Sequence, residues 1–178
     1  SIVNPTMVDP LIELMKKRED TRFDVFEMRR ILEVAAAGYA AERRTDADLD
    51  SIKKRFDELN DAYAAQEADS IREVEADVAF HLASADASHN MALMHVMRSM
   101  IDLLRTDISL NIHRLRQREE DHAPLRAQHS RIFETIVAGD ADKARYVANC
   151  HLDFVEQKLR EHIKHQKREA RAKRRLHQ

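Results

Sequence analysis

Apolar residues recur every three or four positions along most of this chain, the spacing of one face of an α-helix. The clearest stripe lies in residues 23–44, and comparable stripes follow in 45–63, 70–88, 91–118, 125–138 and 140–162. Asp9 and Pro10 suit the N-cap and first residue of a shorter helix that ends near residue 18. Short connections between long helices favour antiparallel neighbours, so the pattern predicts an all-α fold, an antiparallel bundle of six to seven helices.

Residues at the ends of the stripes predict where several helices begin and end. Thr45 and Asp48 have the spacing of a capping box, and Asp140 is a suitable N-cap for the last helix. Gly139 is expected to end the preceding helix, because glycine readily adopts the left-handed conformation that follows a helix C-terminus. The stretch 121–124, which ends in a proline, is expected to separate two helices.

The composition agrees with a helical fold and limits the class of protein. The 178 residues include only 2 Gly and 3 Pro. This length suits one domain, so we expect a single domain over 1–178 with its core in 8–163. No apolar run approaches the roughly 20 residues that span a bilayer, and the first residues do not resemble a signal peptide. Because the single Cys150 excludes an internal disulfide framework, we expect a soluble, cytoplasmic protein with no membrane partner.

The formal net charge of −2 is unevenly distributed. Residues 164–175 contain seven Lys or Arg and one Glu, a net charge of +6, which leaves −8 on the rest of the chain. A basic tail over 164–178 is able to contact nucleic acid or an acidic partner surface. A solvated, fraying helix end, whose cations suit the C-terminal helix dipole, is the simpler interpretation and is preferred.

Asp77 and His81 form the most informative pair in the chain. They lie four residues apart in a helix-forming run, so their side chains project from one face and can hold a single ion. At about 100° per residue both lie beside the apolar stripe, which places the pair at the edge of the core. His129 and His151 lie within apolar stripes of later helices and are expected to point inward. A core histidine is more often hydrogen-bonded than metal-bound, but three imidazoles and one carboxylate together suit a divalent metal.

These motifs, with several others, resemble the C-terminal effector-binding (FCD) domain of FadR-type regulators in the GntR family. The matching pieces occur in the family's order and cover nearly the whole chain: Glu27–Glu33, Asp77–His81, Ala87–Asn90, His129–Asp140 and Ala144–Leu152. The resemblance implies a helical bundle with a divalent metal ion, Zn, Ni or Mn, bound by Asp77, His81, His129 and His151. It also implies a small carboxylate effector beside the metal. The opening residues and the Arg-rich end look most similar to the branch that responds to lactate, glycolate or pyruvate.

The expected effector is a 2-hydroxy or 2-oxo acid, which can chelate a metal through its carboxylate and 2-oxygen. Arg29 is the main candidate to hold the free carboxylate oxygen, because it lies about 70° from the centre of its helix's apolar stripe. An ion pair with Glu33 is an equally weighted role for Arg29, and both roles can hold at once. Three further effector-binding candidates are Ser84, Asn90, for which helix capping is the preferred role, and Arg105.

Members of this family normally begin with a winged-helix DNA-binding domain, for which this chain has neither the room nor the pattern. Either the chain is the sensing fragment of a longer regulator or it has lost that module, and the fragment is preferred. We expect a homodimeric regulator that contacts DNA only through the missing N-terminal domain and is not an enzyme. The alternative is a metalloenzyme acting on a small hydroxy or oxo acid, because a metal held by three histidines can also activate water. A third interpretation is an interaction bundle whose metal only stabilises the fold.

Overall fold

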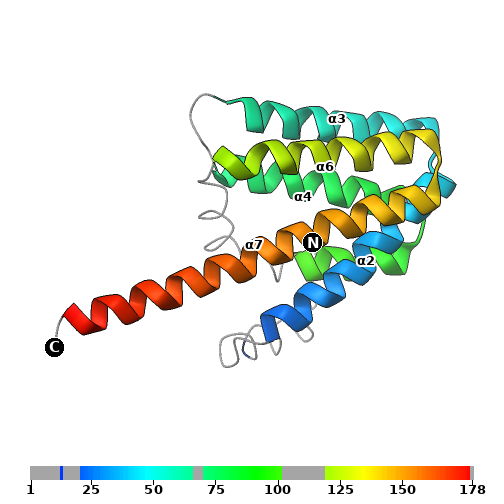
Figure 1. Cartoon of the computed structure of the whole chain (residues 1–178). Coiled ribbons are helices and arrows are strands. Elements are labelled where there is room, and N and C mark those ends of the chain that lie inside the picture. The colour runs from blue at the N-terminus through cyan, green and yellow to red at the C-terminus, as the bar shows by residue number, and fades with distance from the viewer. Residues whose placement is uncertain (1–12, 14–20, 66–69, 102–118, 177–178) are drawn as a thin grey trace.

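The computed structural model describes residues 13, 21–65, 70–101 and 119–176, and the regular elements in these ranges are helices. They are α2 (Thr21–Arg43), α3 (Asp46–Ala64), α4 (Ser70–Asp86), α6 (Glu119–Ala138) and α7 (Ala141–Leu176), with a further helical stretch at 91–101. In Figure 1, α3 packs against α4 and α6, and the long α7 packs against α2 and α6. The predicted all-α fold is confirmed. The helix expected before residue 18 and the expected helix beyond residue 101 lie outside the described residues.

None of the helices in the described residues combines the length and the apolar character that a membrane span requires.

A capping box starts α3. Thr45 Oγ1 accepts a hydrogen bond from Asp48 N–H at 3.3 Å, and Asp48 Oδ2 accepts one from Thr45 N–H at 2.8 Å. His89 Nε2 lies 2.8 Å from the same Asp48 oxygen and ties the start of α3 to the turn after α4. The predicted capping box is therefore confirmed, and it also helps to position α4.

A left-handed glycine joins α6 to α7. Gly139 has a φ of 76° and donates its N–H to Ile136 O at 3.1 Å. The next N–H, of Asp140, bonds to Thr135 O at 3.1 Å and completes a Schellman motif. The Asp140 carboxylate then accepts from Lys143 N–H at 3.0 Å and caps α7, as the sequence predicts. This tight connection holds α6 and α7, which each carry one of the candidate histidines, side by side.

The start of α6 differs from the prediction. The sequence predicts a separating segment at 121–124, but α6 begins at Glu119 and contains Pro124. Pro124 is the sixth residue of α6, so it removes one i→i−4 hydrogen bond in the second turn, and the helix continues around it. A proline near the start of a helix therefore does not have to separate two helices, although the sequence predicts a separation here.

Small and aromatic residues form the apolar layer that supports the interior. The buried face of α2 is built mainly from alanines, which let neighbouring helices approach closely: Ala36, Ala37, Ala40 and Ala41. Phe56 of α3 stacks on Phe133 of α6, with ring centroids 4.6 Å apart and planes at 6°. Phe80 of α4 lies against the same Phe56 at 5.9 Å, and its ring is 5.6 Å from that of His129. The aromatic layer thus adjoins the buried histidines directly.

The helix α4 buries a different face from the one the sequence indicates. Asp77 and His81, expected at the edge of the core, are 9% and 6% exposed, whereas Ile71, placed in the apolar stripe, is 69% exposed. At about 100° per residue, the buried face centres near Asp77 rather than on the apolar stripe. Because α4 packs against both α3 and α2, the polar residues between these two contacts are enclosed as well.

Thr45→Ala should lower the free energy of unfolding by about 1 kcal/mol, because it removes the side-chain acceptor at the start of α3. Urea denaturation followed by circular dichroism measures the change. Ser51→Ala, at an exposed position of the same helix, is the matched control and should stay within about 0.5 kcal/mol of the unsubstituted chain. Equal stability of the two variants would contradict the capping role.

Candidate metal centre

Three buried histidines from three helices meet in the interior. His81 comes from α4, His129 from α6 and His151 from α7, and their exposed fractions are 6%, 1% and 2%. One ring nitrogen of each lies within 4.8 Å of the ring nitrogens of the other two. The inward orientation predicted for His129 and His151 is confirmed, and the three imidazoles form a group that is able to hold a metal ion.

Asp77 borders this group through His129. The Nε2 atoms of His81 and His129 are 3.3 Å apart, and Asp77 Oδ1 lies 3.1 Å from the same His129 nitrogen. Asp77 is one helical turn before His81, as the sequence predicts, although the set of mutually close ligand atoms contains only the three imidazoles. The structure therefore brings all four sequence candidates into one place, with the carboxylate on one side of it.

Polar partners hold the second ring nitrogen of two of the histidines. His81 Nδ1 lies 3.1 Å from Glu33 Oε2, and His151 Nδ1 lies 3.0 Å from Gln128 Oε1. The amide oxygen of Gln128 is an acceptor, so His151 Nδ1 donates its proton there and His151 Nε2 carries the lone pair. The Glu33 carboxylate faces His81 Nδ1 as a charge contact. Metal-binding histidines commonly donate their other N–H to a carboxylate or carbonyl oxygen in this way.

The protonation of the histidines favours a cation between them. Burial lowers the pKa of His81, although the carboxylates of Glu33 and Asp77 act in the opposite direction. Burial, followed by the neighbouring His129 and His81, holds the pKa of His151 well below its ordinary value. Neutral imidazole is the form that binds metal ions. Lone pairs that converge in a dry interior need a shared proton or cation, so the donor set fits a divalent metal.

Arg29 and Glu33 form a buried ion pair behind His81. Arg29 Nε bonds to Glu33 Oε1, while Glu33 Oε2 faces the imidazole. Arg29 is only 8% exposed, and its guanidinium lies 5.7 Å from the centroid of the Phe26 ring. Of the two roles that the sequence offers for Arg29, the structure shows the ion pair.

The other effector-binding candidates fall in different places. Ser84 lines a small enclosed cavity together with Glu33 and two of the histidines. The free volume of this cavity is about 10 Å³, close to what one water molecule needs. Asn90 Oδ1 accepts from Leu93 N–H at 3.1 Å, so Asn90 caps the helix at 91–101 and is not among the residues that line the cavity. Arg105 lies outside the described residues.

Sequence reasoning missed two residues that position the histidines. Glu33 is indicated by the sequence only as a partner of Arg29, yet it lies on the alanine-rich buried face of α2. A carboxylate on such a face requires a polar partner, and that position was the available signal. Gln128 directly precedes His129, and helix periodicity gives no sign that its amide reaches His151 on another helix.

Several known proteins are similar to this chain. The FCD domain family model matches residues 24–154. The "Putative L-lactate dehydrogenase operon regulatory protein" of Escherichia coli (strain K12) is 35% identical over 165 residues, which cover 93% of this chain and 62% of that protein. The "HTH-type transcriptional regulator LutR" of Bacillus subtilis (strain 168) is 36% identical over 147 residues, covering 82% of this chain and 65% of that protein. The chain thus spans less than two thirds of the length of either relative.

A solved structure shares the fold. The protein titled "Streptococcus agalactiae GntR" superposes with a TM-score of 0.61 at 22% identity, over 87% of this chain and 63% of that chain. At this level of identity the similarity supports the helical architecture alone.

Protein purified without chelators should contain about one divalent metal ion per chain, and His129→Ala and His151→Ala should each weaken metal binding more than tenfold, because each removes a ligand. Elemental analysis and competition with a chromophoric chelator measure content and affinity. His95→Ala, at an exposed position, is the control. Unchanged metal content and affinity in both buried-histidine variants would show that the site is misplaced.

Glu33→Gln and Gln128→Leu should each reduce metal affinity about 10–100-fold without removing a ligand, because they weaken the hold on an imidazole Nδ1. The same chelator competition measures this, with thermal unfolding as a check of folding. Glu42→Gln, an exposed carboxylate on the same helix as Glu33, is the matched control. If all three variants bind metal equally well, the contacts to Nδ1 have no positioning role.

Proposed function

The chain belongs to the FCD domain family, and on that premise we propose that it is the effector-sensing domain of a GntR-type transcription regulator. The similar proteins of E. coli and B. subtilis are named as regulators, and the chain spans 62% and 65% of their lengths. In this proposal a winged-helix domain beyond this chain contacts DNA and the bundle controls it. Paired DNA half-sites favour a homodimer.

The convergence of three buried imidazoles is the observation that carries the proposal. His81, His129 and His151 would hold a divalent metal ion, Zn, Ni or Mn, and Asp77 is the proposed fourth ligand because its Oδ1 lies 3.1 Å from His129 Nε2. When bound, the ion supplies a Lewis-acidic anchor for an oxygen ligand. The residues of the chain then determine which ligand fits beside it.

The proposed effector is a small 2-hydroxy or 2-oxo monocarboxylate, the class of lactate, glycolate and pyruvate. The cavity beside His81 and His151 is small, and its polar side chains include the Ser84 hydroxyl. A compact acid with an oxygen next to its carboxylate requires less enlargement of this cavity than a long acyl chain does. The name of the E. coli relative, a regulator of an L-lactate dehydrogenase operon, supports the same class.

Arg29 is the proposed cation for the effector's carboxylate. The positive charge of Arg29 already affects the histidines. The pKa values of His81 and His151 are lowered first by burial and then by neighbouring charges, and Arg29 is one of these charges. Its ion-pair partner Glu33 lies in the cavity wall. A small movement of Arg29 away from Glu33 would therefore present the guanidinium to an anion in the cavity.

The size of the cavity suggests how effector binding is transmitted. A three-carbon acid is larger than the water-sized space of about 10 Å³, so its entry requires the cavity walls to move. These walls come from α2, α4, α6, α7 and the helix at 91–101, which contributes the flexible Met97 side chain. Movement of one wall shifts helices relative to one another, and an attached domain would respond to that shift.

The metalloenzyme alternative receives no support. The carboxylates nearest the histidines are already engaged, Asp77 with His129 and Glu33 with both Arg29 and His81. A general base must be free to reach a proton of the substrate. The named relatives are regulators as well.

L-lactate, glycolate or pyruvate should stabilise the metal-loaded chain by roughly 2.7 kcal/mol when present at about a hundredfold excess over its dissociation constant, because a ligand that binds only the folded state opposes unfolding. A raised melting temperature in a thermal unfolding scan reports this. A long-chain fatty acid is the comparison ligand and should leave the melting temperature unchanged. If none of the three acids raises it, the proposed effector class is wrong.

Titration of the same acids tests the role of Arg29. Arg29→Ala should reduce effector affinity about 10–100-fold, because it removes hydrogen bonds to a charged group, and should leave metal content unchanged. Arg30→Ala is the matched control, since the adjacent Arg30 pairs instead with Asp153 and Glu156 at the surface. Equal effector affinities in the two variants would show that Arg29 does not bind the effector and that its role is the ion pair with Glu33.

A further inference from the structure

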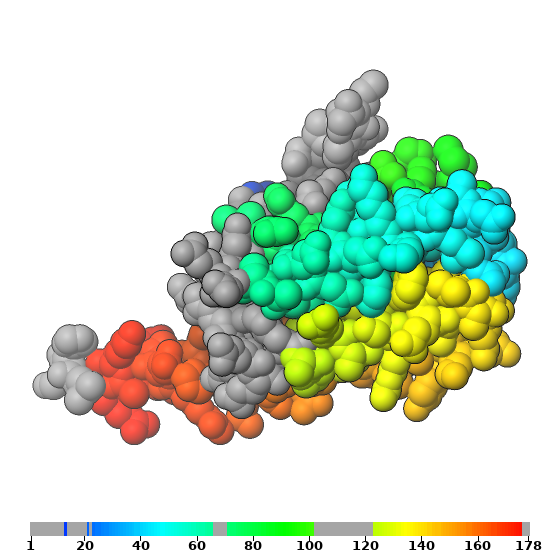
Figure 2. Space-filling view, turned by 90° about the horizontal axis from the view of Figure 1, so that it is seen from above, coloured from blue at the N-terminus to red at the C-terminus, as the bar shows by residue number. Residues whose placement is uncertain are grey.

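The helix α7 continues beyond the bundle as a basic helix. Leu159 is the last buried residue of α7 in the described chain, yet the helix continues to Leu176. We call residues 164–175 the basic arm; apart from the half-buried Gln166, its side chains are exposed. Figures 1 and 2 both show this end of α7 projecting away from the other described helices. In the described residues the basic arm is therefore a continuous helix with solvent-exposed side chains, as expected for a solvated helix end.

Six of the seven positive charges of the basic arm lie on one side of the helix, and Lys173 lies on the opposite side. Four of them follow a four-three-four spacing: Lys164, Arg168, Arg171 and Arg175. At about 100° per residue these four fall within an arc of roughly 60°, and Lys167 and Arg174 widen it to about 120°. The one acidic residue of the arm, Glu169, lies outside this arc, with His165 Nδ1 at 3.7 Å from its carboxylate. The arm therefore has a one-sided basic stripe.

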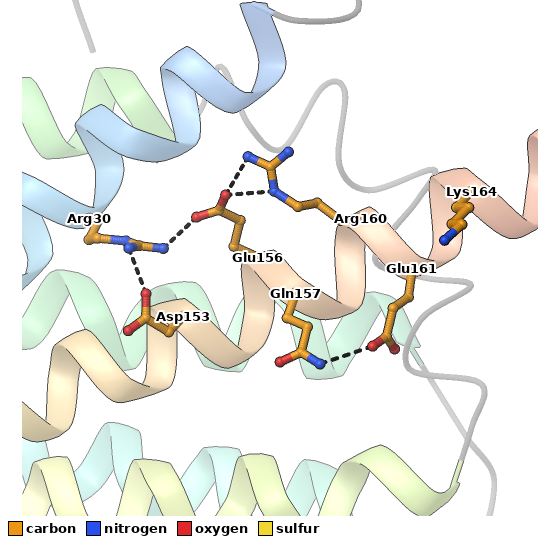
Figure 3. Close-up of a pocket in the computed structure, with 7 residues that line it drawn as sticks. All are labelled: Arg30, Asp153, Glu156, Gln157, Arg160, Glu161 and Lys164. Carbon is orange, nitrogen blue, oxygen red and sulfur yellow. Dashed lines mark hydrogen bonds and ion pairs between the residues drawn. The ribbon is translucent and has the colours of Figure 1, made fainter.

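The helix dipole does not explain this stripe. The dipole favours cations in the last turn only, whereas Lys164 lies about three turns before the end of α7. Earlier in α7 the charges are balanced: Figure 3 shows Arg30 between Asp153 and Glu156, and Arg160 also on Glu156. The basic arm, which begins at Lys164, follows this balanced region and has a net charge of +6.

We propose that the basic arm is a second DNA-contacting element, which binds the phosphate backbone of duplex DNA. This inference rests on the proposed function, because a transcription regulator acts on DNA. From Lys164 to Arg175 the stripe is about 17 Å long, a length over which duplex DNA carries roughly ten phosphate charges. Contacts of this kind add affinity and fix orientation without reading the base sequence.

The chemistry of the arm argues against a membrane surface. A helix that lies on a membrane places large apolar residues opposite its cations. Between Ile163 and Leu176 the arm has only two alanines as apolar residues. An acidic protein surface would use the same cations as DNA, and competition separates these two partners.

Fluorescence anisotropy of a labelled 20-base-pair duplex tests the proposal with the full 178-residue chain at 50–200 mM KCl. Binding should weaken with salt, with a log–log slope of about −4 for four phosphate contacts. A variant with Lys164→Gln, Arg168→Gln, Arg171→Gln and Arg175→Gln should bind at least about tenfold more weakly at 50 mM KCl and lose most of that slope. The matched control removes the same charge from exposed positions of the bundle and should bind like the unsubstituted chain: Lys53→Gln, Lys54→Gln, Arg131→Gln and Lys143→Gln.

Three outcomes overturn the proposal. The first is no duplex binding at 50 mM KCl, and the second is an equal loss of binding in the arm variant and the control. The third is displacement of the duplex by poly-glutamate at equal charge concentration, which would assign the arm to an acidic protein surface. Metal content and the effector-induced rise in melting temperature should be unchanged in the arm variant. Failure of the arm is therefore distinguishable from failure of the sensing function.

Discussion

Three imidazoles held together in the buried interior impose the main constraint on this bundle. One ring nitrogen of each lies within 4.8 Å of those of the other two, Gln128 bonds to His151 Nδ1, and the Glu33 carboxylate faces His81 Nδ1. A well-packed apolar core would be simpler to build and at least as stable, because polar groups lose free energy when they are buried without partners. The burial of three histidines together is explained if they bind a metal cation.

The rest of the bundle places these side chains on separate helices and encloses them. Gly139 turns α6 directly into α7, so His129 and His151 lie close together. The alanine face of α2 allows its neighbours to approach closely, and it places the Glu33 carboxylate next to Nδ1 of His81. Since α2, α4, α6 and α7 all contribute side chains to this group, a change in the ligand shell would be transmitted to four helices at once.

The sequence predicts the fold well because the determining signals are local. Apolar spacing, the Thr45 capping box and the left-handed Gly139 are each read within a few residues and each appears in the structure. The inward direction of His129 and His151 follows from the same periodicity. Contacts between helices are not predicted in this way. The hydrogen bond between Gln128 and His151 depends on how α6 and α7 pack. The rotation of α4 that buries Asp77 and exposes Ile71 depends on how α4 packs against its neighbours. Helix periodicity carries no information on such angles.

The proposed function requires the effector to bind through the metal, and calorimetric titration tests this requirement most directly. L-lactate is titrated into the chain loaded with one equivalent of Zn²⁺ and into chain stripped by chelation, with circular dichroism used to establish that both are folded. We predict a saturable heat of binding in the metal-loaded protein and none in the stripped protein. Equal affinity in the two would contradict the account, because it would show that the buried histidines take no part in recognising the acid.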